Sequence, residues 1–595
     1  MFTTRPEIKG TFGVVASTHW LASAAGMAVL EAGGNAFDAA VATGFALQVV
    51  EPHLNGPGGD LPIILSRARR NGGGGVEVIC GQGVAPAGAT IAHYRGLGLD
   101  LVPGSGLLAT VVPGSFDAWM LMLRDYGTLR PRDVLGHAID YAQNGYALVP
   151  GIAAKIAEVQ ALFRDEWPSS AALYLPGGAL PKAGSLFRNA TLAATYQRLL
   201  AEAEAAGGDR EAQIEAMRKA WYRGFVAETI ERFCRDNELM DTSGERHSGV
   251  LTADDMANWQ ASKEAPATFD YHGYRVCKGG VWSQGPVFLQ QLALLAGFDI
   301  AAMDPLGPDF VHTVTECAKL AFADREAYYG DPNFVEVPLE TLLSADYNAA
   351  RRKLVAENAS HALRPGEIEG FDSGLDHVPD PDQVGADAFG GGEPTVQIGG
   401  QAGDTCHLDV IDREGNMVSA TPSGGWLQSS PVIPELGFCL NSRAQMFWLE
   451  EGLPASLEPG KRPRTTLSVN LVLNEDEEPQ MVFGTPGGDY QDQWSLTFFL
   501  RHVHHGLNLQ AAIDAPSFQT DHMPSSFWPR AADLGSLSVE ARLPEATKKD
   551  LAERGHRVSE VDGWSLGRLS AAKREDGMLK AAANPRFMQG YAIGR

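Results

Sequence analysis

The stretch GGQAGDTCHLDVIDREGNMVSATPSGG occupies residues 399–425 and joins two kinds of sequence. Its centre has the pattern of a β-hairpin that turns around residues 413–416, where Gly415 supplies the flexibility of the turn. Its front end is glycine-rich and acidic up to Asp404, and strand-like residues begin at once with Thr405. A threonine at a strand start is common, but it gains a special chemistry if the chain is cut in front of it.

The residues before Thr405 have the composition of a mobile connector. Residues 370–404 are rich in Gly, Pro and Asp and cannot bury much apolar surface. A threonine hydroxyl is a weak nucleophile at neutral pH, but an N-terminal threonine carries its own base, an α-amine whose pKa is ordinarily about 7.7 to 8.0. This chemistry at Thr405 requires cleavage of the bond after Asp404, and a mobile connector would present that bond for cutting.

The composition is that of a globular enzyme. The 595 residues are 44% hydrophobic, which is ordinary globular composition and enough for a large core. A formal net charge of −25 would repel phosphate backbones, so we expect no nucleic-acid partner. The six cysteines form no C-x-x-C pair, and we expect neither metal nor cofactor. The N-terminus lacks a signal-peptide pattern and no apolar run could span a membrane, which predicts a cytoplasmic protein without a membrane partner.

The periodicity along the chain predicts helices and strands on both sides of the connector. A strand at residues 12–17 precedes a helix from Trp20 to Leu30, and Asn35 is a candidate N-cap of the next helix. Residues 106–240 are mainly helical in pattern, whereas the region after the connector begins with strand-like hairpins. The sequence contains no internal repeat.

Two other local features carry weaker signals of chemistry. DGWSLG matches the G-x-S-x-G pattern of α/β-hydrolases around Ser565, but that fold needs a histidine after the serine and none follows. His502, His504 and His505 lie in RHVHHG, where the first and third could share a helix face, yet nothing nearby resembles a further metal ligand. We interpret the first as coincidental and the second as a surface helix end.

Six segments, in order along nearly the whole chain, resemble the γ-glutamyltranspeptidase family of N-terminal-nucleophile (Ntn) hydrolases. Several long matches in a fixed order are far more specific than one short motif. The segments are VVASTHWLASAAGMAVLEAGGNAFDAAVATGFALQVVEPHLNGPGGD (residues 14–60), AFADREAYYGDP (321–332), GDTCHLDVIDREGNMVSATPS (403–423), GKRPRTTLS (460–468), FGTPGGD (483–489) and AAANPR (581–586).

The resemblance implies an α+β fold of four layers, αββα, in which two stacked antiparallel sheets lie between helical layers. It also implies autocatalytic cleavage between Asp404 and Thr405. The Thr405 hydroxyl would attack the preceding carbonyl, giving an ester that water hydrolyses, and Thr405 would then be the nucleophile. Residues 1–404 would become a large subunit and residues 405–595 a small subunit, and the two would remain one intertwined fold.

The same resemblance assigns roles to five further positions. Gly487 and Gly488 match the paired glycines whose backbone N–H groups form the oxyanion hole, and such donors are typically worth about 3 to 4 kcal/mol each. Ser423 falls where the family has a hydroxyl residue that supports the nucleophile. Thr465 and Thr466 match its pair of serines, which help to hold the substrate. Taken singly, each could be a plain turn or strand residue; taken together and in order, they favour a site.

Three positions depart from the family in one direction. Gln82 stands where the family has an arginine for the donor's α-carboxylate, and Met446 where it has an aspartate for the α-ammonium. Gly425 stands where the family has an asparagine. An ammonium buried against Met446 would be unpaired, which is costly. The sequence therefore predicts weak or absent activity on glutathione.

Arg443 adds a charge to the same segment as Met446. It could receive a carboxylate at a different place on the acyl group, which would suit a dicarboxylate amide of the glutaryl or oxamate kind. It could equally be a surface residue paired with Glu450 or Glu451. The sequence leaves these two alternatives even.

Three hypotheses about function follow. The leading one is a self-processing Ntn amidohydrolase or acylase that cleaves a small acyl amide through an acyl-Thr405 intermediate, with the two fragments as partners of each other. The second is a genuine glutathione hydrolase or γ-glutamyltransferase that reaches its donor with other residues. The third is an uncleaved relative that binds a ligand without catalysis. The natural acyl donor, the choice of water or an amine as acceptor, and assembly into a homo-oligomer stay open.

Overall fold

The computed structural model describes residues 2–68, 75–378 and 405–595. Residues 379–404, which form most of the predicted connector and include Asp404, lie outside the described residues. The described chain is built around two seven-stranded sheets, in which all hydrogen-bonded neighbours are antiparallel. We call them sheet A and sheet B.

The strands of each sheet are given in their spatial order. Sheet A consists of β1 (Ile8–Gly10), β20 (Met578–Ala583), β19 (Ser570–Glu575), β15 (Pro479–Gly484), β14 (Asn470–Leu473), β11 (Tyr274–Lys278) and β10 (Ala267–Tyr271). Sheet B consists of β21 (Tyr591–Gly594), β2 (Gly13–Ser17), β12 (Leu408–Asp412), β13 (Met417–Ala420), β3 (Leu61–Ser66), β4 (Val76–Gly81) and β9 (Ser262–Glu264).

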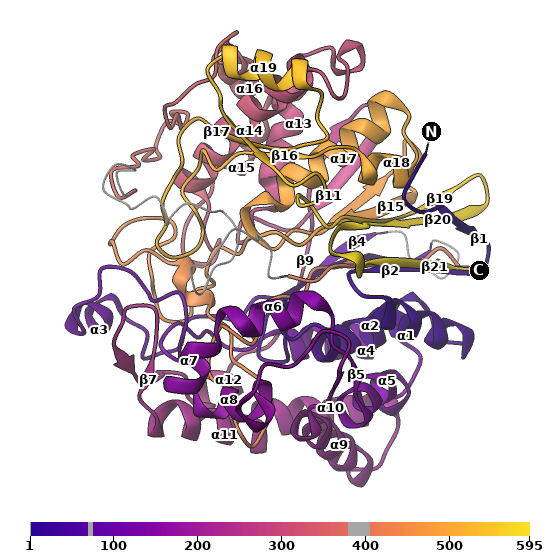
Figure 1. The fold of residues 1–595 in the computed structure, drawn as a ribbon, viewed down its shortest axis with the longest axis vertical. Helices are drawn as coiled ribbons and strands as arrows, with labels where there is room; N and C mark the ends of the chain where they lie inside the picture. Colours follow the sequence, from indigo (N-terminus) through magenta and orange to yellow (C-terminus); the bar gives the residue numbers. More distant parts are fainter. Residues whose placement is uncertain (1, 69–74, 379–404) are drawn as a thin grey trace.

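Helices cover the outer face of each sheet, and the two sheets lie between these helical layers (Figure 1). The layer on sheet B comprises α1 (Trp20–Glu31), α2 (Ala36–Val50), α4 (Ser115–Tyr126) and α5 (Pro131–Asn144), with α6 (Pro150–Glu158), α7 (Gln160–Asp165), α8 (Pro168–Tyr174), α9 (Ala190–Ala205), α10 (Arg210–Tyr222) and α11 (Phe225–Asp236) outside it. The layer on sheet A comprises α13 (Gly285–Leu295), α14 (Pro308–Tyr328), α15 (Leu339–Leu343), α16 (Ala345–Arg352), α17 (Gln491–His505), α18 (Leu509–Asp514) and α19 (Glu545–Glu553).

Three apolar cores hold the four layers together. One lies between sheet B and its helices, one between sheet A and its helices, and one between the two sheets. Successive residues of a strand point to opposite faces, so Val14 of β2 packs between the sheets while Val15 packs toward the helices. Burial on both faces explains the unbroken apolar runs of β2 and β3. The predicted α+β fold with αββα layers is confirmed.

Local sequence signals set several element ends. The Asn35 side chain accepts hydrogen bonds from two N–H groups in the first turn of α2, and so caps that helix as predicted. Gly415, with φ of +90°, makes the predicted turn between β12 and β13. Gly506, with φ of +63°, ends α17. Each of these positions needs a cap or a left-handed backbone that its residue supplies.

Strands from before and after Thr405 pair with each other within both sheets. In sheet B, β12 pairs with β2 and β13 pairs with β3. In sheet A, β14 pairs with β11, and β20 pairs with β1. All three cores draw on both parts of the chain. The described residues on the two sides of the predicted cut therefore share both sheets and all three cores.

Smaller elements lie around the two sheets. They are α3 (Ile91–Gly96), α12 (Ala253–Ala257), the strand pairs β5 (Tyr146–Ala147) with β6 (Leu186–Phe187) and β7 (Leu239–Met240) with β8 (Arg246–His247), and the sheet of β16 (Phe518–Gln519), β17 (Ser536–Glu540) and β18 (Arg557–Val561). Within the described ranges, no helix combines the length and apolar character needed to cross a bilayer.

Candidate active site

Thr405 lies beside Ser423 at the start of the segment that leads into β12. The two residues form an antiparallel bridge, and their hydroxyl oxygens are 3.0 Å apart, which is hydrogen-bond distance. The N–H of Cys406 donates to the Pro422 carbonyl at 3.0 Å and holds the two segments in register. Both hydroxyl residues are buried, at 0% and 1% exposure. Backbone pairing thus brings the predicted nucleophile and its predicted supporting hydroxyl together.

The glycine loop at residues 56–59 packs directly on the Ser423 segment. The N–H of Asp60 donates to the Ser423 carbonyl at 2.8 Å, and the N–H of Ser423 donates to the Asp60 carbonyl at 3.1 Å. A Cβ on Gly59 would lie 2.0 Å from the Ser423 carbonyl oxygen. The absence of a side chain at Gly59 is therefore what permits this approach of two backbones.

Gly425 has a structural reason for departing from the family's asparagine. Its φ is +66°, and a Cβ there would lie 2.9 to 3.0 Å from backbone atoms of the Gly59 loop and of Cys439. A longer side chain would have to displace backbone on two sides. An asparagine at position 425 would therefore require these loops to shift.

Gly487 and Gly488 form the bend between β15 and α17. Their φ values are +129° and +54°, conformations that favour glycine. A Cβ on Gly487 would lie 2.2 Å from the Cζ3 atom of Trp494. Among the described residues, neither glycine N–H has a hydrogen-bond acceptor. The bend therefore has two amide donors to offer, as an oxyanion hole requires.

Gln284, which the sequence reasoning missed, connects this bend to the Thr465 segment. Its backbone N–H donates to the Thr465 carbonyl at 2.9 Å, and its side-chain Nε2 donates to the Gly488 carbonyl at 3.1 Å. Thr466 is 1% exposed, and its hydroxyl has no hydrogen-bond partner within the described residues. Gln284 thus links two predicted parts of the site by hydrogen bonds: the substrate-holding threonines and the oxyanion glycines.

Gln82 and Met446 are both buried and bring no charge. Nε2 of Gln82 donates to the Gly83 carbonyl at 3.1 Å, and its Oε1 lacks a hydrogen-bond partner in the described part of the chain. Met446 ends the short 3₁₀ helix η6 (Arg443–Met446), and its carbonyl accepts a 2.7 Å hydrogen bond from Arg530.

Arg443 is fully buried and forms an ion pair with Asp60. Its Nε donates to Oδ1 of Asp60 at 2.9 Å, and its Cζ lies 5.0 Å from the centre of the Trp426 ring. The alternative of a surface arginine paired with Glu450 or Glu451 is wrong, because η6 turns this side chain inward to 0% exposure. Burial raises the pKa of Asp60, and the Arg443 charge opposes that rise.

A second group of buried charges consists of residues next to Thr465 and Gly488 in the chain, two residues of α14, and Arg530. Its members are Arg325, Glu326, Arg464, Asp489 and Arg530. The Glu326 carboxylate accepts hydrogen bonds from Arg464 at 2.8 Å and from Arg530 at 3.3 Å. Burial alone would raise the pKa of Glu326, but Arg464 and its neighbours hold it well below its usual range. Because Arg464 precedes Thr465 and Asp489 follows Gly488, the group ties both segments to α14.

Cys406, beside Thr405 in the chain, is held in its thiol form. Its Sγ donates to Oε2 of Glu51 at 2.9 Å and accepts a hydrogen bond from Asn55 at 3.0 Å. Burial raises its pKa well above the usual range. A thiol is a poor nucleophile compared with a thiolate, so Cys406 does not compete with Thr405. Sequence reasoning had no signal for this Glu51 contact.

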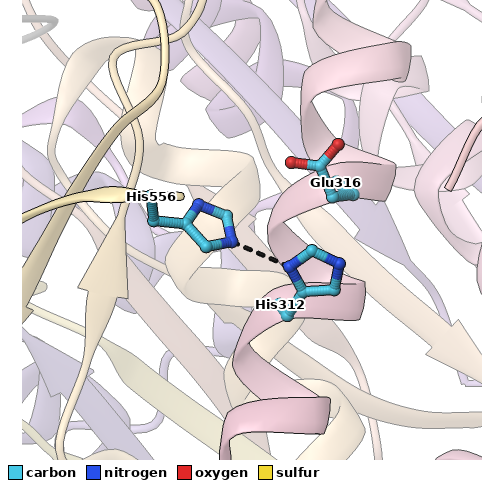
Figure 2. Close-up of side chains that lie close together, drawn as sticks. All are labelled: His312, Glu316 and His556. Atoms are coloured by element: carbon cyan, nitrogen blue, oxygen red, sulfur yellow. Dashed lines mark hydrogen bonds between the residues drawn. The ribbon is translucent and has the colours of Figure 1, made fainter. Parts of the chain in front are cut away.

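One group of potential metal ligands lies outside this site. Figure 2 shows His312 and Glu316, one turn apart on α14, facing His556. The Nδ1 atom of His312 and the Nε2 atom of His556 are 2.8 Å apart and share a hydrogen bond. The Glu316 carboxylate already accepts hydrogen bonds from Lys319 at 2.7 Å and from Arg364 at 3.2 Å. Two cations on that carboxylate would repel a divalent ion.

The same group fixes the segment that leads toward the connector. His312 Nε2 contacts the Ala356 carbonyl at 2.8 Å, and Lys319 donates to the Ser360 carbonyl at 3.0 Å. His522, further along the chain, contacts the Ala362 carbonyl at 3.1 Å. The role of this cluster is therefore structural: together with His522, it holds residues 356–362 in place through polar contacts.

His502, His504 and Ser565 have ordinary hydrogen-bond partners, whereas the buried Nε2 of His505 has none among the described residues. His502 contacts the Leu507 carbonyl at 2.7 Å, where α17 ends. His504 contacts the Tyr271 hydroxyl at 2.9 Å. Ser565 donates to the Asp562 carbonyl at 2.8 Å in a surface turn.

Comparison with known proteins places the whole chain beside one group of enzymes. The family described as Gamma-glutamyltranspeptidase matches residues 22–594. The Glutathione hydrolase-like YwrD proenzyme of Bacillus subtilis (strain 168) is 31% identical, with 99% of each chain covered. The Acylase ACY 1 proenzyme of Pseudomonas sp. (strain SE83) is 30% identical, with 96% of this chain and 92% of that protein covered. The solved structure of LmbA2991HD is 57% identical, covers 100% of both chains and has a TM-score of 0.92.

Proposed function

Because the chain belongs to the γ-glutamyltranspeptidase family, we propose that it is a self-processing Ntn amidohydrolase that cleaves a small acyl amide through an acyl-Thr405 intermediate. The observation that carries this proposal is the buried pair of hydroxyls on Thr405 and Ser423, 3.0 Å apart. Similarity to an acylase proenzyme along almost the full length supports it. The reaction has two stages, processing and turnover.

In processing, Oγ1 of Thr405 attacks the carbonyl carbon of Asp404. The C–N bond between the two residues breaks, the nitrogen takes the hydroxyl proton, and Asp404 becomes an ester on Thr405. Water then hydrolyses the ester, which restores the hydroxyl and leaves a free α-amine. Ser423 supports this step because its hydroxyl lies within hydrogen-bond distance of the attacking oxygen.

In turnover, the new α-amine of Thr405 accepts the proton from its own Oγ1, which attacks the acyl-amide carbon. The N–H groups of Gly487 and Gly488 would stabilise the negative oxygen that forms. The C–N bond of the substrate then breaks, and the leaving amine takes the proton from the α-amine. Water attacks the acyl ester by the same route and releases the acid.

The residues at the positions where the family binds its donor disfavour the amino-acid head of glutathione. Gln82 and Met446 carry no charge to match an α-carboxylate or an α-ammonium. Arg443 is neutralised by Asp60 at 2.9 Å, so these two charges cancel. A free ammonium in such surroundings would be buried without a partner. A donor without that ammonium, such as a glutaryl amide or a short uncharged acyl amide, avoids this cost.

A matched pair of substrates tests the proposal. Glutaryl anilide and γ-glutamyl anilide differ by a single α-amino group, so their ratio of kcat/KM isolates the cost of the ammonium. We expect the glutaryl compound to react faster by on the order of 10²-fold or more. A butyryl anilide tests whether the remaining carboxylate contributes. The Thr405→Ala variant is the control for background hydrolysis.

The alternatives make different predictions in the same assay. A γ-glutamyl anilide that reacts as fast as the glutaryl compound would overturn the proposed donor and favour a glutathione hydrolase. A protein that stays in one piece and releases no anilide from any of the three compounds would favour a ligand-binding relative. Adding glycylglycine as a second amine separates transfer from hydrolysis.

A further inference from the structure

A small cavity lies against one face of α17. Its volume is about 10 Å³, and four of its lining residues come from α17. These are Trp494, Thr497, Phe498 and Arg501, which share one face of the helix because they are spaced by three or four residues. Arg586, from the segment after β20, lines the opposite side.

Positive charge exceeds negative charge around this cavity. Arg586 contacts Glu540 through Nε at 2.8 Å and Nη2 at 2.9 Å, and Arg542 contacts the same carboxylate at 2.7 Å. Arg501 has carbonyl partners instead, at Pro305 and Pro516. Two guanidinium groups thus share the Glu540 carboxylate, and Arg501 forms no ion pair among the described residues. Burial and, to a smaller extent, the nearby Arg586 lower the pKa of Arg501 to about 9.

The next acidic side chain does not remove this surplus from the cavity. Asp514 accepts hydrogen bonds from the N–H and hydroxyl of Thr4 and from Gln510. Among the residues that line the cavity, none is acidic. Apart from the two arginines and two hydroxyl residues, the lining is apolar.

Two buried N–H groups of the lining residues have no acceptor in the described part of the chain. They are Nε of Arg501 and Nε1 of Trp494, and each residue is 2% exposed. A buried donor without an acceptor costs about 1–3 kcal/mol. Both residues line the same cavity, so an acceptor placed there has two candidate N–H donors.

We propose that this cavity binds a monatomic anion, with chloride as the abundant candidate. A volume of about 10 Å³ suits an occupant about the size of one water molecule, so we consider a monatomic anion rather than phosphate, sulfate or a carboxylate. A water molecule could donate to the hydroxyls of Thr497 and Ser517, but it would leave the surplus positive charge unchanged. A halide accepts hydrogen bonds from every side and offsets the surplus charge of Arg501 and Arg586.

The proposed anion lies one side chain away from the predicted oxyanion hole. Trp494 lines the cavity, and a Cβ on Gly487 would lie 2.2 Å from its Cζ3 atom. An acceptor on Nε1 would therefore help to fix the indole on which the Gly487 bend packs. This site is independent of the identity of the acyl donor.

Crystals grown in sodium bromide test the site directly. Bromide scatters anomalously, and we expect an anomalous difference peak between Trp494 and Arg501. No peak in that cavity, in crystals whose other bromide sites are visible, would overturn the proposal. Crystals in sodium gluconate are the control, because gluconate is too large for about 10 Å³.

Thermal unfolding in solution provides a second test. At constant ionic strength, replacing gluconate by chloride should raise Tm in a saturable way, since a ligand at about 100 times its Kd shifts the folding equilibrium about 100-fold. Trp494→Phe removes one donor and should weaken the chloride midpoint by roughly 10-fold. Trp221→Phe is the matched control, because its indole N–H is also buried without a partner in the described residues but lies outside this cavity. An equal chloride response in both variants would contradict the proposal.

Discussion

The Gly487→Ala substitution tests the proposed oxyanion hole with one added methyl group. The new Cβ would lie 2.2 Å from Cζ3 of Trp494, far inside van der Waals contact. The backbone φ of +129° also disfavours alanine, so the bend must move. Loss of an aligned oxyanion donor costs about 2.7–4 kcal/mol, which corresponds to a fall of roughly 10²–10³ in kcat. We expect a loss of that size.

Gly506→Ala is the matched control for backbone strain. Gly506 also has a positive φ, +63°, but a Cβ there has no heavy atom within 4 Å. Both variants should lose about 1–3 kcal/mol of stability from the unfavourable backbone conformation. Gly487→Ala alone should lose catalysis, because the Gly506 end of α17 has no place in the proposed reaction.

The assay is initial-rate release of anilide from the best acyl anilide, measured after processing. Intact mass gives the processed fraction of each variant, so that kcat refers to cut protein alone. Thermal unfolding shows that both variants are folded. If kcat of Gly487→Ala stays within about five-fold of Gly506→Ala, the bend does not supply oxyanion donors and the reasoning is refuted.

Two further predictions concern buried charge. Arg443→Met leaves Asp60 without its cation and should lower the free energy of unfolding by about 3–5 kcal/mol. Adding Asp60→Asn should recover most of that loss. If urea unfolding shows no recovery in the double variant, the pairing of Arg443 with Asp60 is contradicted. His522 and His556 have pKa values lowered to about 3 and about 2, first by burial and then by Lys319. The unfolded chain then binds more protons below about pH 6.5, so stability present above that pH is lost on acidification, by about 1 kcal/mol per histidine near pH 5.5. The midpoint of urea unfolding, measured against pH, reports this loss of stability. His522→Gln should make the midpoint depend less steeply on pH, and an unchanged slope would contradict the role of His522.

The sequence was sufficient where the signal is local. The hairpin around Gly415, the cap at Asn35 and the helix end at Gly506 each depend on a few neighbouring residues. The order of the family segments then predicted the four-layer fold. The bridge between Thr405 and Ser423 follows from that hairpin, because antiparallel pairing brings its two ends together.

The sequence was insufficient where partners lie far apart in the chain. Arg443 and Asp60 are 383 positions apart, so the choice between surface and interior depended on how η6 packs. Gln284 belongs to no motif, and its role as a link between the Thr465 and Gly488 segments appears once α13 is placed. Periodicity gives the burial of a residue but not the identity of a distant charged partner.

Intact mass spectrometry of the purified protein tests the central claim most directly. We predict two polypeptides for the wild type, one ending at Asp404 and one beginning at Thr405, which remain associated during size-exclusion chromatography. For Thr405→Ala we predict a single chain of 595 residues. An uncut wild-type chain that still releases amine from an acyl anilide, or a Thr405→Ala protein cut at the same bond, would contradict the role of Thr405.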